Sequence, residues 1–314
     1  MAGDDAQRAA MARRGAGENA CMKPGLLLAF DDEQSPASAL ADALSIPLAL
    51  VARHRFPDGE TRLQLPAELP ADLLLMRGLH QPNDKLVELL ITVPAARELG
   101  ARDIVLVCPY LAYMRQDMAF NPGEAVSQRH IGALLASQVD GLITVDPHLH
   151  RIQALDDVMP GRRNRALSAA TLLGQWVAGH VGAALLLGPD EEALQWVAAA
   201  GRAHGLEHAV CRKQRLGDRE VRVCLPALPL AGRAVVLMDD VASTGRTLVE
   251  ATLACLAAGA ASVDVAVTHA LFVDDALAQL RMAGVRHVWS TDAVPHETAV
   301  VALAPLLADA VRAL

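Results

Sequence analysis

The sequence has few aromatic residues, little clustered positive charge and no long apolar run. Phenylalanine, tyrosine and tryptophan together make up 3% of the 314 residues, so rings on which nucleic-acid bases could stack are scarce. The net charge is -8, and no run of adjacent lysine or arginine residues is longer than Arg13-Arg14. These features argue against a nucleic-acid partner. No apolar run approaches the ~18 residues that a membrane-spanning helix needs, so no membrane partner is expected.

Cysteine is also sparse. The five cysteines are an odd number and show no CxxC spacing, which indicates a reduced, cytoplasmic protein without a disulfide framework. The first 24 residues lack the apolar core of a signal peptide and carry Asp4, Asp5 and Glu18, which a transit peptide would avoid. We interpret residues 1–24 as a flexible N-terminal extension.

Short apolar segments alternate with longer segments of helical periodicity, a pattern typical of βαβ units and a largely parallel sheet. Strands are expected at 26–30, 72–76, 103–108, 141–146, 184–188, 234–238, 262–269 and 287–291. Helices are expected at 83–100, 244–260 and 300–314. Proline, glycine and charge gather near 158–166, between the two sets of four strands. The sequence therefore predicts two α/β halves.

Two adjacent carboxylates follow the expected strand at 234–238, in "VVLMDDVASTGRT". Ligands of open α/β sheets lie at the carboxyl ends of strands. Asp239 and Asp240 can accept hydrogen bonds from the vicinal hydroxyls of a ribose. The next turn offers backbone N–H groups and the positive end of a helix to a phosphate, together with three hydroxyls. An Asp-rich helix cap would use one carboxylate only, so we favour a ribose-phosphate site.

This segment resembles the phosphoribosyl-diphosphate (PRPP) loop of type I phosphoribosyltransferases and ribose-phosphate diphosphokinases. By that resemblance, ribose 5-phosphate is expected to bind Asp239, Asp240, Ser243, Thr244, Gly245, Arg246 and Thr247. The loop alone does not separate an enzyme that consumes PRPP from one that makes it.

Two further segments are similar to the diphosphokinases. "FPDGE" at 56–60 is by itself only a turn, but it resembles the family motif whose ring and two acids hold the adenine and ribose of ATP. "PYLAYMRQD" at 109–117 resembles the family's Tyr-x-Arg-Gln-Asp segment, with a solvated helix start as the alternative. The resemblance implies that ATP contacts Phe56, Asp58, Glu60, Arg115, Gln116 and Asp117.

The segment "ITVDPHLH" at 143–150 ends an expected strand with His148 and His150. Such a pair could be half of a zinc site, but no cysteine or third histidine stands at ligand spacing nearby. The resemblance implies instead that His148 and Asp190 hold Mg²⁺, the expected cofactor.

A basic segment, "CRKQR" at 211–215, is by itself an ordinary loop patch. The resemblance places it in the family's mobile catalytic segment, where Lys213 and Arg215 would embrace the transferring group. The chain departs from the family in two places. Glu191 and Glu192 replace a small or glycine-containing turn, and Arg246 stands where glycine is common.

The resemblance spans roughly residues 25–314 and implies two phosphoribosyltransferase-like domains, each a mainly parallel sheet flanked by helices. Residues 25–163, completed by the helix at 300–314, would form the ATP side, and residues 164–299 the ribose 5-phosphate side. The expected reaction converts ATP and ribose 5-phosphate to AMP and PRPP, in a homo-oligomer that is a dimer or hexamer.

Two alternatives stay open. A PRPP-dependent phosphoribosyltransferase would leave the segments at 56–60 and 109–117 unexplained. A catalytically weak paralogue that regulates an active diphosphokinase is supported only by Glu191 and Glu192.

Overall fold

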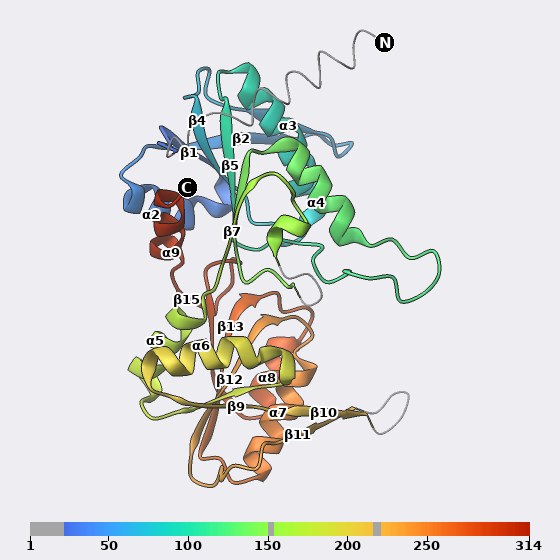
Figure 1. Ribbon diagram of the computed structural model, residues 1–314, viewed down its shortest axis with the longest axis vertical. Helices are drawn as coiled ribbons and strands as arrows, with labels where there is room; N and C mark the ends of the chain where they lie inside the picture. The colour runs from blue at the N-terminus through green and yellow to red at the C-terminus, as the bar shows by residue number, and fades with distance from the viewer. Residues whose placement is uncertain (1–21, 150–153, 216–220) are drawn as a thin grey trace.

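The structure is a computed structural model that describes residues 22–149, 154–215 and 221–314. Within these ranges the chain forms two mostly parallel sheets, each flanked by helices and placed one above the other in Figure 1. The predicted α/β class with two sheets is confirmed. Residues 1–21 of the predicted N-terminal extension lie outside the described residues, as does His150.

The first sheet has the strand order β3-β2-β1-β4-β5-β6-β7, and only β3 runs antiparallel to its neighbour. Its strands are β1 (Leu26–Phe30), β2 (Leu48–Arg55), β3 (Thr61–Gln64), β4 (Asp72–Met76), β5 (Asp103–Cys108), β6 (Gly141–Val145) and β7 (Arg163–Leu167). The flanking helices are α2 (Gln34–Leu44), α3 (Pro82–Glu98) and α4 (Ser127–Gln138), with short 3₁₀ turns η2 (Asp31–Glu33) and η3 (Leu155–Asp157). Strands β1, β4, β5 and β6 are almost continuous buried aliphatic runs, because helices cover both faces of the sheet.

The second sheet has the order β15-β14-β13-β12-β8-β9, with every neighbouring pair parallel. Its strands are β8 (Leu185–Gly188), β9 (Glu207–Val210), β12 (Ala234–Ala242), β13 (Ser262–Ala270), β14 (Val285–Thr291) and β15 (Ala299–Val301). The helices are α5 (Ala170–Val181), α6 (Leu194–His204), α7 (Arg246–Ala257) and α8 (Ala276–Met282), with the 3₁₀ turn η4 (Glu191–Ala193).

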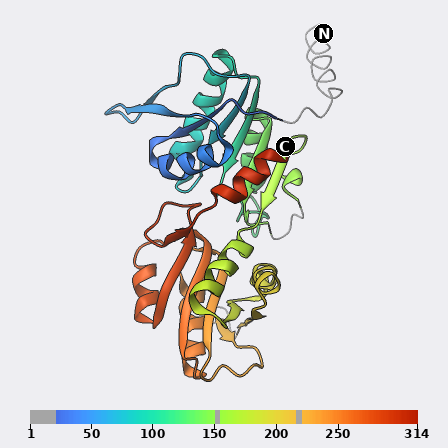
Figure 2. The ribbon, with the colours of Figure 1, turned by 90° about the vertical axis from the view of Figure 1, so that its left-hand side faces the viewer.

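The C-terminal helix α9 (Ala304–Arg312) packs beside α2 on one face of the first sheet. In Figure 2 it lies at the level of the upper sheet, after the chain has left the lower one. Its Leu307 and Val311 share a buried cluster with Leu40 of α2 and Leu74 of β4. The first sheet also extends past residue 163, because β7 pairs with β6 along its whole length. The division of the chain into two domains stays a prediction.

A two-stranded antiparallel ribbon projects from the second sheet in Figure 1. It consists of β10 (Arg212–Arg215) and β11 (Val221–Cys224). The basic segment expected to be a loop is therefore a strand over these four residues. Its polar, non-alternating sequence gives no sign of a buried face, which is why the strand escaped prediction. The side chains of Lys213 and Arg215 lie outside the described residues.

Among the helices that the structure describes, none combines the length and the apolar character that a membrane crossing requires.

Candidate active site

The two adjacent carboxylates lie near the carboxyl end of β12, next to the end of β8. Sequence reasoning placed Asp239 and Asp240 just after the strand, but the strand continues to Ala242, because Val241 and Ala242 still pair with β13. The backbone N–H of Asp240 donates to Oδ1 of Asp239 at 3.0 Å. Local pairing thus holds the two side chains in fixed relative positions.

The pKa values of this pair move in opposite directions. Burial raises the pKa of Asp239, and the charges of Asp240 and Asp190 raise it further. Burial is the largest influence on the pKa of Asp240 and would raise it, but the hydrogen bond with His148, which joins Nδ1 and Oδ2 at 2.9 Å, lowers it together with the charges of His148 and His269. The charges of Asp240 and Asp190 thus both act on Asp239 at the ends of β8 and β12. Their shared negative charge suits a bound cation.

The turn from β12 into α7 has the form expected of a phosphate cradle. Gly245 has φ +68°, a left-handed conformation that favours glycine, and it is the N-cap residue of α7. Ser243 and Thr247 are half-buried, whereas Thr244 and Arg246 are exposed. The backbone N–H groups at the start of α7 carry the positive end of the helix dipole. The start of α7 therefore has the electrostatic character that favours a bound anion.

The predicted metal ligands lie on different sheets. His148 follows β6 of the first sheet and meets Asp240, whereas Asp190 caps η4 and accepts a hydrogen bond from the N–H of Glu192 at 3.1 Å. The described residues contain no group of three or more His, Cys, Asp or Glu side chains arranged to hold a metal. Mg²⁺ commonly takes only one or two carboxylates and completes its shell with water and phosphate oxygens. The donors around Asp190 and Asp239 fit that requirement.

The substituted turn after Asp190 faces the ribbon. Glu191 forms an ion pair with Arg212 of β10, with 3.5 Å between Nε and Oε1. Both side chains are exposed, so the pair adds little stability. The pair nevertheless places the positive charge of Arg212 beside Glu191, one of the two acidic residues by which this turn differs from the family.

On the other sheet, the segment 56–60 forms the turn of the β2–β3 hairpin. The turn is closed by Phe56 N–H donating to the Glu60 carbonyl at 2.8 Å, and Asp58 Oδ1 accepts from Glu60 N–H at 3.1 Å. Gly59 adopts φ +97° in this turn. The Phe56 ring meets the His54 ring edge-on at 4.7 Å and stays 38% exposed. All residues from 52 to 60 are exposed, so the predicted ATP residues are presented outward.

The other predicted ATP residues, Arg115, Gln116 and Asp117, lie in the connection between β5 and α4. Arg115 is exposed, Asp117 is buried, and the Gln116 amide donates to the Met118 carbonyl at 2.9 Å. Burial raises the pKa of Tyr110, while Arg115 lowers it and Asp240 raises it. Arg115 of the first half and Asp240 of the second thus both lie close enough to Tyr110 to act on it.

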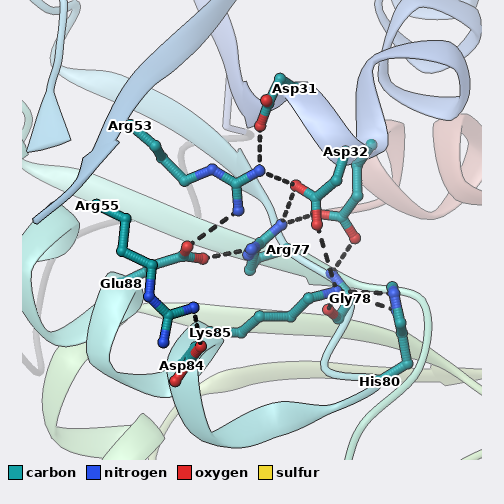
Figure 3. Close-up of polar contacts among 11 residues, drawn as sticks. Asp31, Asp32, Arg53, Arg55, Arg77, Gly78, His80, Asp84, Lys85 and Glu88 are labelled. Carbon is teal, nitrogen blue, oxygen red and sulfur yellow. Dashed lines mark hydrogen bonds and ion pairs between the residues drawn. The ribbon is translucent and has the colours of Figure 1, made fainter. Parts of the chain in front are cut away.

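A charged cluster under the hairpin was not anticipated from the sequence (Figure 3). Arg77, directly after β4, is fully buried and donates to Asp32 at 2.7 Å, to Glu33 at 3.1 Å and to Glu88. Its guanidinium also lies over the Phe30 ring, 4.2 Å from the centroid. We call Asp32, Glu33, Arg53, Arg77, Lys85 and Glu88 the Arg77 network.

This network fixes the base of the hairpin. Arg53 of β2 donates to Glu88 of α3 at 3.0 Å and also pairs with Asp32 at 3.2 Å. Further out, Arg55 pairs with Asp84 at 3.2 Å, with both side chains exposed. No motif marks these residues, because each charged side chain by itself looks like a solvated one. The burial of Glu33, Arg77, Lys85 and Glu88 arises only where β1, β4 and α3 meet.

Comparisons with known proteins agree with this geometry. Residues 26–138 match the family model for the N-terminal domain of ribose phosphate pyrophosphokinase. A ribose-phosphate pyrophosphokinase of Methanopyrus kandleri is 37% identical over 290 residues, which cover 91% of this chain and 98% of that protein. One from Halobacterium salinarum is 33% identical over 91% of this chain and 100% of its own length.

Among solved structures, phosphoribosylpyrophosphate synthetase from Mycobacterium smegmatis has the same fold, with a TM-score of 0.79 at 24% identity over 93% of this chain and 98% of that one. The sequence relatives extend over nearly the whole chain, including both sheets. This protein therefore belongs to the ribose-phosphate pyrophosphokinase family.

Proposed function

We propose that this protein is a ribose-phosphate pyrophosphokinase, which transfers the pyrophosphoryl group of ATP to the C1 hydroxyl of ribose 5-phosphate and yields PRPP and AMP. The observation that carries the proposal is the pair Asp239 and Asp240 beside the Gly245 turn. The contact between Asp240 and His148 links this pair to the first sheet, which holds the ATP-side residues. The names of the full-length relatives support the same reaction.

In this reaction the protein mainly positions two substrates. Asp239 and Asp240 accept hydrogen bonds from the ribose hydroxyls, while the turn 243–247 holds the 5-phosphate at the positive end of α7. The C1 hydroxyl then attacks the β-phosphorus of ATP in line, the bond to the α-phosphate oxygen breaks, and AMP leaves. Fixing both reactants in this geometry supplies much of the rate.

On the ATP side, Phe56 stacks on adenine and the two acids of the hairpin turn, Asp58 and Glu60, accept from the ribose. Arg115 contacts phosphate, with Gln116 toward the base. Arg115 is exposed and therefore free to reach a ligand.

Bound Mg²⁺ supplies charge neutralisation to the phosphate oxygens. His148 and Asp190 would hold it, and the carboxylate of Asp239 adds negative charge beside Asp190. Lys213 and Arg215 on β10 carry the cationic side chains that close on the transferring group.

One assay tests the reaction. Purified protein with ATP, Mg²⁺ and ribose 5-phosphate should release AMP, and Asp240→Ala should raise the KM for ribose 5-phosphate. Release of ADP would indicate transfer of a single phosphoryl group and contradict the proposal. Absence of any nucleotide product would favour the regulatory paralogue, whose support is weaker now that Glu191 is paired with Arg212.

We also propose that the protein is a homo-oligomer. Helix α3 buries one face against the first sheet and exposes a second apolar face. Val87, Leu90 and Ile91 are 51%, 38% and 40% exposed, at the i, i+3, i+4 spacing of one helical stripe. A contiguous apolar stripe of this kind marks an interaction surface. A second copy of the chain is the occupant that the family resemblance favours.

A reduced, cytoplasmic location is proposed from the cysteines. Cys108, Cys211 and Cys255 are buried free thiols. Burial raises the pKa of Cys211 to about 12 and that of Cys255 to about 11. These thiols stay protonated and serve as apolar filling, which matches a compartment where disulfides are rare.

A further inference from the structure

The carboxylate of Asp146, at the end of β6, binds groups from the second half of the chain. Its Oδ1 accepts a hydrogen bond from the Trp196 indole Nε1 at 2.8 Å. Its Oδ2 accepts from the Thr268 hydroxyl at 2.7 Å and from the backbone N–H of Ala169 at 3.0 Å. Asp146 is only 5% exposed. Two side-chain donors, from α6 and β13, and the backbone N–H of Ala169, which directly precedes α5, thus converge on one buried carboxylate of the first sheet.

The backbone at Asp146 takes part in the same contact. Its φ of +38° is left-handed, a conformation that aspartate tolerates better than most residues. The turned chain presents its carbonyl groups to His269, whose Nε2 lies 2.9 Å from the Val145 oxygen and 3.3 Å from the Asp146 oxygen. His148, two residues further on, meets Asp240. Residues 145–148 are therefore held at several points by the second sheet.

We propose that Asp146 is a positioning residue: it fixes the segment 145–148 against the second sheet, so that His148 meets Asp240, and it does not bind the metal. The role of His148 rests on the proposed function, but the link between the sheets does not. Hydrogen bonds to a carboxylate are stronger than those between neutral groups. Two of the three donors, Trp196 and Thr268, belong to the second sheet and its helices, and together they fix the end of β6 against that sheet.

The competing role is that of a direct ligand. A carboxylate two residues before a candidate ligand histidine would be an obvious choice for Mg²⁺, which prefers oxygen. The geometry opposes this, because both oxygens already accept hydrogen bonds and the side chain is buried. Metal binding would require the indole, the hydroxyl or the backbone N–H to lose its acceptor inside the protein, which is unfavourable for a buried donor.

The test compares Asp146→Asn with Trp196→Phe and Thr268→Val, which remove the two side-chain donors but leave the Asp146 carboxylate in place. Trp176→Phe is the matched control, because the Trp176 Nε1 has no partner among the described residues. Affinity for Mn²⁺ and the kinetic constants with ATP and ribose 5-phosphate are measured for each variant. We expect Asp146→Asn to lose about 10- to 100-fold in metal affinity or kcat, the donor variants to lose in the same direction, and Trp176→Phe to match wild type.

The proposal is overturned if both donor variants keep wild-type Mn²⁺ affinity while Asp146→Asn loses it, since Asp146 would then be a ligand. A second readout does not need activity: proton exchange at the Trp196 indole N–H, followed by NMR, should accelerate in Asp146→Asn and in Thr268→Val. Unchanged exchange in both would also overturn it. If wild type makes no AMP, the proposed function fails but the exchange result still decides the link. If Asp146→Asn does not fold, the Mn²⁺ affinity and the indole exchange of Thr268→Val decide the outcome.

Discussion

Among single residues, the buried charges of the first sheet depend closely on one another. Glu33, Arg77, Lys85 and Glu88 are all less than 9% exposed and carry two charges of each sign. Burial raises the pKa of Glu33, although Arg77 and Lys85 both act to lower it. Such a set is stable only while every partner is present, because a lone buried charge has lost its water without compensation.

Arg77→Met should therefore lower the free energy of unfolding by about 3–5 kcal/mol, since it leaves Glu33 and Glu88 buried without their main partner. Denaturant unfolding measures the change. The matched control is Arg55→Met, which removes the exposed pair with Asp84 and should cost no more than about 1 kcal/mol. If the two substitutions lowered the free energy of unfolding equally, the burial of the Arg77 network would add nothing to stability.

His80 makes the stability depend on pH. Burial, and then the nearby Lys85 charge, lower its pKa from 6.5 to about 4 in the folded protein. Between these values the unfolded chain binds a proton that the folded chain does not, so the stability present above pH 6.5 is lost as the pH falls toward 4. The loss should be about 1–3 kcal/mol, since one pKa unit corresponds to about 1.4 kcal/mol and His80 is only half-buried.

The measurement is denaturant unfolding between pH 4 and 7, for wild type and for His80→Gln. The difference between the two curves isolates the histidine from other titrating groups. Parallel curves over this range would contradict the assigned pKa.

At the scale of elements, two antiparallel ribbons carry some of the residues expected to act on ATP, while Arg115, Gln116 and Asp117 lie in the connection between β5 and α4. The β2–β3 hairpin holds Phe56 at its turn, and the β10–β11 ribbon holds Lys213 opposite Val223. Sequence reasoning found the motif at 56–60 but neither ribbon, because exposed antiparallel strands lack the continuous apolar runs of the buried parallel strands. The strands β1, β4 and β5, by contrast, match their predicted bounds.

Lys213→Ala should lower kcat by about 10²–10³, while the Kd for ATP stays nearly unchanged, because its charge serves the transition state more than the ground state. Steady-state kinetics and equilibrium ATP binding separate the two effects. Arg212→Ala, its neighbour on β10, is the control and should retain nearly full activity, since its described partner is the exposed Glu191. A kcat of Lys213→Ala equal to that of wild type would contradict a catalytic role for the β10–β11 ribbon.

For the whole molecule, the apolar face of α3 predicts assembly. Leu90→Glu should dissociate the oligomer at micromolar concentration, because a charge buried without a partner opposes association by several kcal/mol. Light scattering coupled to size exclusion gives the mass. Leu253→Glu is the control, since Leu253 is an exposed apolar residue of α7, 52% accessible, on the second half. A monomeric wild type, or dissociation by the control alone, would refute assembly through α3.

The sequence by itself determined the α/β class, the two sheets and the motifs of the family. These properties are local, because an apolar run, a helical period or a turn of Ser, Thr and Gly can be read within one stretch of chain. The tertiary structure decided which side chains meet. His148 and Asp240 are 92 positions apart, and Asp146 and Thr268 are 122 apart. No local pattern records such pairings, because the hydrogen-bond partner of a buried polar group is set by the packing of distant elements.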